Sequence, residues 1–143
     1  MLQKFYRRTH FGFTLVELLV VVSIVGIISV FAVPAYLQQI RKANRAEAKA
    51  ALMNGSQLME RCFTEFTAYT HANCPTTADL DSMGNNFFTY TIAATTSTFT
   101  LTADANAAKN QDKDTDCVQF SISNTGLRTA KNSLNTNTTG KCW

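Results

Sequence analysis

Residues 13 to 33, FTLVELLVVVSIVGIISVFAV, form a run of 21 residues in which Glu17 is the only charged side chain. A helix rises about 1.5 Å per residue, so a helix of this length can cross a hydrocarbon core about 30 Å thick. The run therefore predicts a membrane-spanning helix. Because it takes up much of the apolar content of a 143-residue chain, any core elsewhere must be small.

The polar leader MLQKFYRRTHFG precedes the run, so the N-terminus could also be a secretory signal peptide with cleavage after Ala35. Glu17 counts against this alternative. A carboxylate within an apolar signal opposes insertion by about 3 kcal/mol, and a signal that is removed has no reason to keep one. We therefore interpret the run as part of the mature protein.

The net charge of +3 comes from the leader, because three of the 13 Lys and Arg residues are Lys4, Arg7 and Arg8. The ten that remain balance the ten Asp and Glu residues. No excess of positive charge is left to attract a nucleic acid, so DNA is a possible partner that the charge does not support.

A basic cluster follows the run closely and consists of Arg41, Lys42, Arg45 and Lys49. On a helix just outside a membrane, we interpret such residues as solvated or facing lipid headgroups. Basic residues on both sides of the run leave its orientation undecided by the positive-inside rule. The later cysteines and polar strands indicate that the C-terminal part lies outside the cytoplasm, which places the N-terminus inside.

Helix-forming residues continue beyond Pro34 as far as Phe66. Apolar residues there recur at steps of three and four and predict one buried stripe: Ala48, Leu52, Gly55, Met59, Cys62 and Phe66. We expect one helix of about 50 residues, apolar in its first half and amphipathic in its second. Pro34 either kinks or locally opens this helix or marks the end of its spanning part, and the sequence favours neither.

After Phe66, short segments alternate apolar and polar residues at 87 to 94, 98 to 105 and 117 to 123, as strands of a half-buried sheet do. Asn124, Thr125 and Gly126 predict a turn, after which residues 127 to 130 can pair back as a fourth strand. The stripe on the helix needs a partner, and the apolar face of the sheet supplies one. The sequence thus predicts an α+β fold with an antiparallel sheet of three or four strands.

The four cysteines all follow the apolar run, and an even number outside the cytoplasm favours disulfides: Cys62, Cys74, Cys117 and Cys142. Three pairings are possible, of which the pairing of sequence neighbours closes the shortest loops. The cysteine spacing has no C-x-x-C and no paired histidine, so we expect no metal site.

Asp112, Asp114 and Asp116 alternate as calcium ligands do. The EF-hand pattern fails, however, because Cys117 occupies the sixth position and Ser123 the twelfth. We interpret these residues as a solvated acidic loop. His10 and His71 each stand apart from any nucleophile motif, so we expect neither an enzyme nor a cofactor.

The segment Gly12-Phe13-Thr14-Leu15-Val16-Glu17-Leu18, with the apolar run and Pro34 after it, resembles the N-terminus of type IV pilins. The segments RAEAKAAL and LMER, and the stretch from CVQFSISNTGLRTA to the final KCW, resemble the PilE-like minor pilins. The resemblance covers nearly the whole chain. It implies the type IV pilin fold, a long N-terminal helix on an antiparallel sheet with disulfide-closed loops.

The resemblance also implies roles for particular residues. A prepilin peptidase would cut between Gly12 and Phe13 and methylate the new amine of Phe13. Glu17 would pair with the Phe13 amine of a neighbouring subunit and guide its docking, and an isolated carboxylate in lipid has a physical reason to seek a cation. The implied disulfides are Cys62–Cys74 and Cys117–Cys142.

We accordingly expect four parts: a cleaved leader (1–12), a transmembrane and filament-core helix (13–33), an amphipathic extracytoplasmic helix (34–66) and a β-rich head (67–143). The expected function is that of a minor pilin supporting twitching motility, adhesion and possible DNA uptake. Its implied partners are other pilin subunits, prepilin peptidase, the inner-membrane assembly platform and, before assembly, membrane lipid. The alternatives are a type II secretion pseudopilin and a pilin specialised as a DNA receptor.

Overall fold

The structure is a computed structural model that describes residues 12–143. The leader residues Lys4, Arg7, Arg8 and His10, discussed above, lie outside the described residues. The chain divides into two compact units at the junction of Leu37 and Gln38. We call them unit 1 and unit 2 and describe each by itself.

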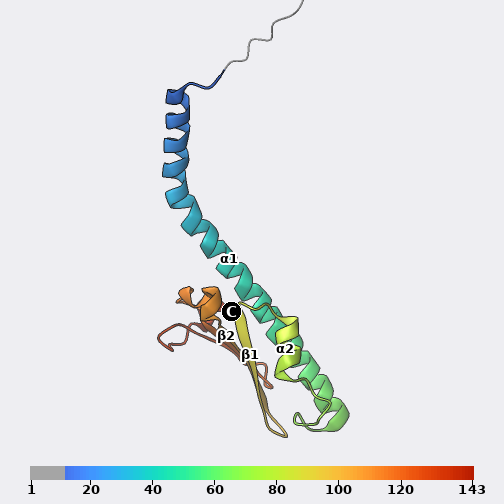
Figure 1. Ribbon diagram of the computed structural model, residues 1–143. Helices are drawn as coiled ribbons and strands as arrows, with labels where there is room; N and C mark the ends of the chain where they lie inside the picture. Colours follow the sequence, from blue (N-terminus) through green and yellow to red (C-terminus); the bar gives the residue numbers. More distant parts are fainter. Residues whose placement is uncertain (1–11) are drawn as a thin grey trace, which may run out of the picture. The chain divides into compact units, whose positions relative to one another are not determined.

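Helix α1 (Leu15–Phe66) is the long helix predicted from the sequence, and it runs from blue to green in Figure 1. It continues through Pro34, so this proline does not end the helix. In unit 1 every described residue is exposed, and by length and composition this part of α1 could span a membrane. The hydroxyls of Ser23 and Ser29 donate hydrogen bonds to backbone carbonyls one turn earlier, each at 2.7 Å, so the helix itself satisfies these two polar groups.

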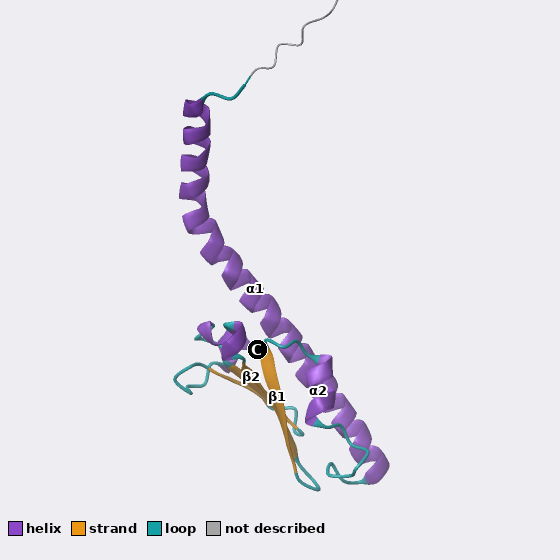
Figure 2. Cartoon of the chain, viewed as in Figure 1, coloured by secondary structure: helices purple, strands orange, loops and turns teal. Residues whose placement is uncertain are grey.

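Unit 2 contains a four-stranded antiparallel sheet in the order β1-β2-β3-β4 (Figure 2). Its strands are β1 (Phe88–Ala94), β2 (Phe99–Ala105), β3 (Gln119–Ser123) and β4 (Arg128–Lys131). The alternation in the sequence produces the burial pattern, since alternate side chains of each strand point to the same face. The predicted strands and the α+β fold are therefore confirmed.

The core of unit 2 lies between one face of the sheet and the stripe of α1. Ala48, Leu52, Gly55, Met59 and Cys62 are all buried as predicted, whereas Phe66 is half-buried. Ala48, Leu52 and Met59 pack with the inward residues of the sheet and with Leu80 into one cluster. The helix stripe thus has the partner that its apolar character requires.

Glycine at position 55 permits the closest approach in this core. A Cβ atom placed there would lie 2.4 Å from Cδ1 of Leu80 and 3.1 Å from Cδ1 of Leu101. Leu80 and Leu101 are fully buried, so neither can move aside freely. The absence of a side chain at Gly55 therefore lets α1 lie against both residues.

Four short helices were not predicted. They are α2 (Thr77–Met83), the 3₁₀ turns η1 (Ala107–Lys109) and η2 (Gln111–Lys113), and α3 (Thr139–Cys142). The start of α2 has a capping box in which Thr76 and Asp79 bond each other's backbone N–H. The two 3₁₀ turns lie between β2 and β3, and Gln111 of η2 and Asp114 directly after it carry the polar side chains described next.

Candidate functional site

The residues expected to act in processing lie at the start of the described chain. Gly12 and Phe13 precede α1, and the Phe13 side chain is 86% exposed. Glu17 lies in the first turn of the same helix, and Pro34 lies further along it. The structure therefore brings Gly12, Phe13 and Glu17 close together at one helix end, while Pro34 lies apart from them.

Glu17 forms a capping box with Thr14. The Glu17 carboxylate accepts hydrogen bonds from the backbone N–H and the hydroxyl of Thr14, at 2.9 and 2.8 Å, and the Glu17 N–H donates to the Thr14 hydroxyl at 3.2 Å. These bonds satisfy donors that every helix leaves open in its first turn. In the single subunit, the carboxylate thus has a local partner before any neighbour arrives.

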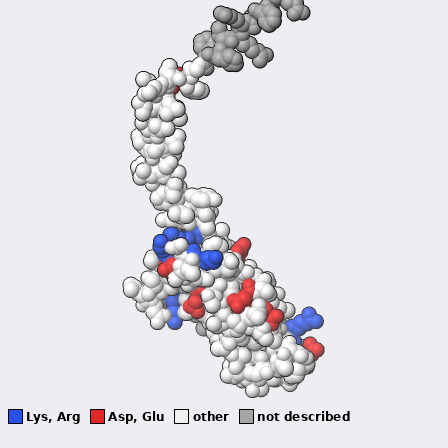
Figure 3. All heavy atoms as spheres, in the orientation of Figure 1, with Lys and Arg blue, Asp and Glu red and all other residues white. Residues whose placement is uncertain are grey.

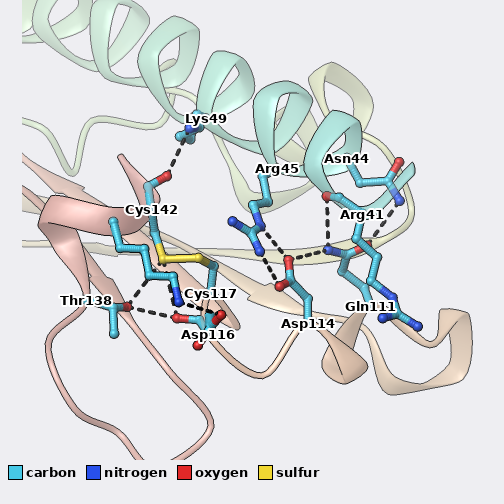
Figure 4. Close-up of polar contacts among 11 residues, drawn as sticks. Arg41, Asn44, Arg45, Lys49, Gln111, Asp114, Asp116, Cys117, Thr138 and Cys142 are labelled. Atoms are coloured by element: carbon cyan, nitrogen blue, oxygen red, sulfur yellow. Dashed lines mark hydrogen bonds and ion pairs between the residues drawn. A yellow bond between two sulfur atoms is a disulfide. The ribbon is translucent and has the colours of Figure 1, made fainter. Parts of the chain in front are cut away.

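In unit 2, a polar network joins α1 to the turns between β2 and β3 (Figure 4). The guanidinium of Arg45 donates two hydrogen bonds to the Asp114 carboxylate. The Gln111 side chain accepts a hydrogen bond from Asn44 at 3.0 Å and donates to the backbone carbonyl of Arg41 at 3.4 Å. Asn44, Gln111 and Asp114 are all buried, so the network fixes these turns against the helix.

This network corrects two interpretations made from the sequence. Arg45 was interpreted as solvated or facing headgroups, but its side chain is only 16% exposed and is paired with Asp114. Asp114 was assigned to a solvated acidic loop, but it is 7% exposed. The periodicity of α1 could not show this, because the partner of Arg45 is 69 residues away in the sequence.

Lys49 is also not a free surface charge. Its ammonium donates a 2.9 Å hydrogen bond to the backbone carbonyl of Cys142, and burial, with a smaller effect from the charge of Arg45, lowers the pKa of Lys49. Nearby, Lys141 bonds the exposed carboxylate of Asp116 at 2.7 Å, and this bond and charge lower the pKa of Asp116. Both lysines thus help to hold the C-terminal segment.

Two disulfides join Cys62 to Cys74 and Cys117 to Cys142, which are the pairs implied by the resemblance. The second bond attaches the C-terminal helix to the segment before β3 (Figure 4). Residues 12–143 contain no group of three His, Cys, Asp or Glu residues that could hold a metal ion.

Lys and Arg side chains gather at one end of unit 2, as Figure 3 shows. Arg41, Lys42 and Lys113 line one pocket of unit 2 and make no ion pair among residues 12–143. Lys113 belongs to η2, far from α1 in sequence, so the linear basic cluster did not reveal it. The capping box at Thr14 could have been found, since Thr-x-x-Glu before an apolar run is its usual signature.

Comparison with protein families gives two matches. Residues 34–121 match the family "Type IV minor pilin ComP, DNA uptake sequence receptor". Residues 7–33 match the "Prokaryotic N-terminal methylation motif", which contains Gly12, Phe13 and Glu17. The two matches adjoin each other and together cover residues 7–121.

Individual proteins give shorter or more distant matches. The chain is 53% identical over 36 residues to the "Type IV major fimbrial protein FimA" and to a "Fimbrial protein", both of Dichelobacter nodosus; this is 25% of the chain and 22% of each relative. Among solved structures, the non-core minor pilin PilV of Neisseria meningitidis matches with a TM-score of 0.55 and 21% identity. That match covers 68% of this chain and 93% of PilV, and it shows a shared fold.

Proposed function

The chain belongs to the family described as type IV minor pilin ComP, DNA uptake sequence receptor, and we propose on this basis that it is a minor subunit of a type IV pilus that takes part in DNA uptake. The observation that carries the proposal is the family match over residues 34–121, joined to an N-terminal methylation motif over residues 7–33. Pilins are structural proteins, so the role is assembly and binding rather than catalysis.

The proposed subunit has four parts. The leader (1–12) is removed, residues 13–33 first span the membrane and later form part of the filament core, residues 34–66 form an amphipathic helix, and residues 67–143 form the head. Prepilin peptidase cuts between Gly12 and Phe13 and methylates the Phe13 amine. The exposure of both residues ahead of α1 supports this step, because a protease must reach the backbone on both sides of the bond.

Assembly uses the helix-capping carboxylate. In the isolated subunit Glu17 bonds Thr14, and in the filament it turns to the Phe13 amine of a neighbour in the apolar core. A charged pair in low dielectric is favoured strongly over a separated carboxylate and amine, so the pair sets the register between subunits. Pro34 adjusts the packing of α1 against neighbouring helices.

Before assembly, the subunit resides in the inner membrane with its N-terminus in the cytoplasm and its disulfide-bonded head outside the cytoplasm. The assembly platform then moves it from the lipid into the extracellular pilus. The two disulfides support this orientation, since such bonds persist in oxidising compartments. Twitching motility and adhesion are the further activities that a pilus of this type supports.

The role in DNA uptake rests on the family description, because the charges of residues 13–143 are balanced. A secretion pseudopilin is the less favoured alternative, since the matched family is one of pilins. A deletion strain separates the two: loss of DNA uptake supports the proposal, whereas loss of protein secretion with normal uptake would support the pseudopilin. Mobility shifts of short duplexes by the detergent-solubilised subunit then test direct binding, which should weaken steeply with salt.

A further inference from the structure

One pocket of unit 2 collects positive charge that the fold itself does not use. Its volume is about 410 Å³, and its lining combines residues of α1 with residues around η2 and α3. Five of the lining side chains are cationic and two are carboxylates. The pocket therefore carries a formal excess of three positive charges.

The two carboxylates do not neutralise the excess, because each already has its own cation. Asp114 is paired with Arg45, and Asp116 is paired with Lys141. The remaining three, Arg41, Lys42 and Lys113, make no side-chain hydrogen bond or ion pair among residues 12–143. Three cations around one hollow repel one another, and an anion held between them would relieve that repulsion.

The pocket residues of α1 lie close in sequence to the apolar run, and this indicates which anion is available to them. Gln38, Arg41 and Lys42 line it, and they follow the apolar run ending at Val33 by five to nine residues. Arg41 follows Val33 by only eight residues, so the chain itself keeps this side of the pocket close to the end of the apolar run. A polar layer of several ångströms, rich in phosphates, borders the hydrocarbon core there, and long basic side chains reach into it.

We propose that this pocket binds the phosphate of an anionic phospholipid headgroup while the subunit resides in the membrane. Arg41 and Lys42 approach the phosphate from α1, and Lys113 approaches it from η2. A row of duplex phosphates fits a concave pocket less well than one headgroup does, and DNA is not tethered to this position as the bilayer is. The inference rests on the membrane residence proposed above and adds a lipid-specific contact to it.

Native mass spectrometry of the full-length, detergent-solubilised subunit tests the proposal. Phosphatidylglycerol should remain bound as one molecule per subunit, and phosphatidylcholine, which has no net charge, should not. Lys113→Gln should weaken phosphatidylglycerol binding about fivefold, and Arg41→Gln with Lys42→Gln should weaken it further. Lys109→Gln is the matched control, since Lys109 is an exposed lysine of the adjacent turn η1 that does not line the pocket.

Equal retention of the two lipids, or an equal loss in Lys109→Gln and Lys113→Gln, would overturn the proposal. Two competition arms identify other sources of phosphate. Displacement of phosphatidylglycerol by inorganic phosphate at a concentration similar to that of the lipid would show a site for free phosphate. Displacement by a short duplex at a concentration below that of the lipid would show a DNA site. The measurement needs no filament. A negative result therefore contradicts lipid binding alone and is distinguishable from a failure of pilus assembly.

Discussion

The carboxylate of Asp114, in the turns between β2 and β3, accepts two hydrogen bonds from the guanidinium of Arg45 in α1. Both side chains are mostly buried, at 6% and 16% exposed. This pair fixes the segment that carries Lys113 against the helix that carries Arg41 and Lys42. It thereby builds the charged end of unit 2.

Asp114→Asn should destabilise unit 2 by about 3 kcal/mol, because it leaves the Arg45 charge buried without a counter-ion. Urea unfolding of the solubilised subunit measures this change. Asp112→Asn, at an exposed position of the same turn, should have little effect. Replacing both partners, as in Arg45→Met with Asp114→Leu, should recover most of the loss, and an additive loss would contradict the explanation.

Gly55→Ala should cost about 1–3 kcal/mol, since its new methyl group would overlap the side chain of Leu80. Thermal unfolding checks the size of the effect. Gly140→Ala is the control, because a Cβ there meets nothing within 4 Å. Combining Gly55→Ala with Leu80→Val should cost less than the sum of the two single changes, and simple additivity would argue against contact between them.

Tyr90 should make unit 2 sensitive to alkali. Burial raises the pKa of Tyr90 from 10.0 to about 12, and the nearby Asn85 backbone lowers it by a smaller amount. Because the folded-state pKa is the higher one, the stabilisation is complete below pH 10 and is lost as the pH rises towards 12. The loss should approach about 3 kcal/mol.

Denaturant unfolding at a series of alkaline pH values, in wild type and Tyr90→Phe, checks this expectation. The variant keeps the ring and removes the titrating hydroxyl, so its stability should fall less between pH 10 and 12. Burial also raises the pKa of Tyr69, so a smaller decline should remain in the variant. Identical declines in the two proteins would show that Tyr90 is not responsible.

Glu17→Ala and Thr14→Val should separate helix capping from assembly. Each change removes one half of the capping box and should cost the first turn of α1 about 1 kcal/mol: Glu17→Ala removes the acceptor of the Thr14 N–H, and Thr14→Val removes the acceptor of the Glu17 N–H. Only Glu17→Ala removes the carboxylate for the neighbouring amine, so it should abolish incorporation into pili while membrane insertion persists. Immunoblots of membranes and sheared pili measure both. Loss of incorporation in Thr14→Val as well would mean that the cap itself is what assembly requires.

The elements of the fold could be predicted because their signals are local. The stripe from Ala48 to Cys62 and the alternation around Phe99 and Leu101 each reveal a buried face within a few turns or residues. A capping box in the sequence also marks the start of α2. The seven residues of this helix, however, show too little periodicity to predict a helix by themselves. Short helices depend on the surrounding core more than on their own sequence.

The polar network could not be predicted in the same way. Arg45 and Lys49 look like members of a solvated cluster with Arg41 and Lys42, because all four share one short stretch of helix. Only the three-dimensional fold brings Asp114 to Arg45 and the carbonyl of Cys142 to Lys49. It leaves Arg41 and Lys42 without a side-chain partner in the part of the chain that the structure describes. Contacts between residues far apart in sequence leave no periodic trace, and the basic pocket is made of such contacts.

Mass spectrometry of sheared pili tests the central claim, membership of the filament, most directly. We expect a minor component whose first residue is Phe13, whose terminal amine carries one methyl group, and whose cysteines pair as Cys62–Cys74 and Cys117–Cys142. Absence of the chain from pili of cells that express it, or its presence there with residues 1–12 still attached, would contradict the account.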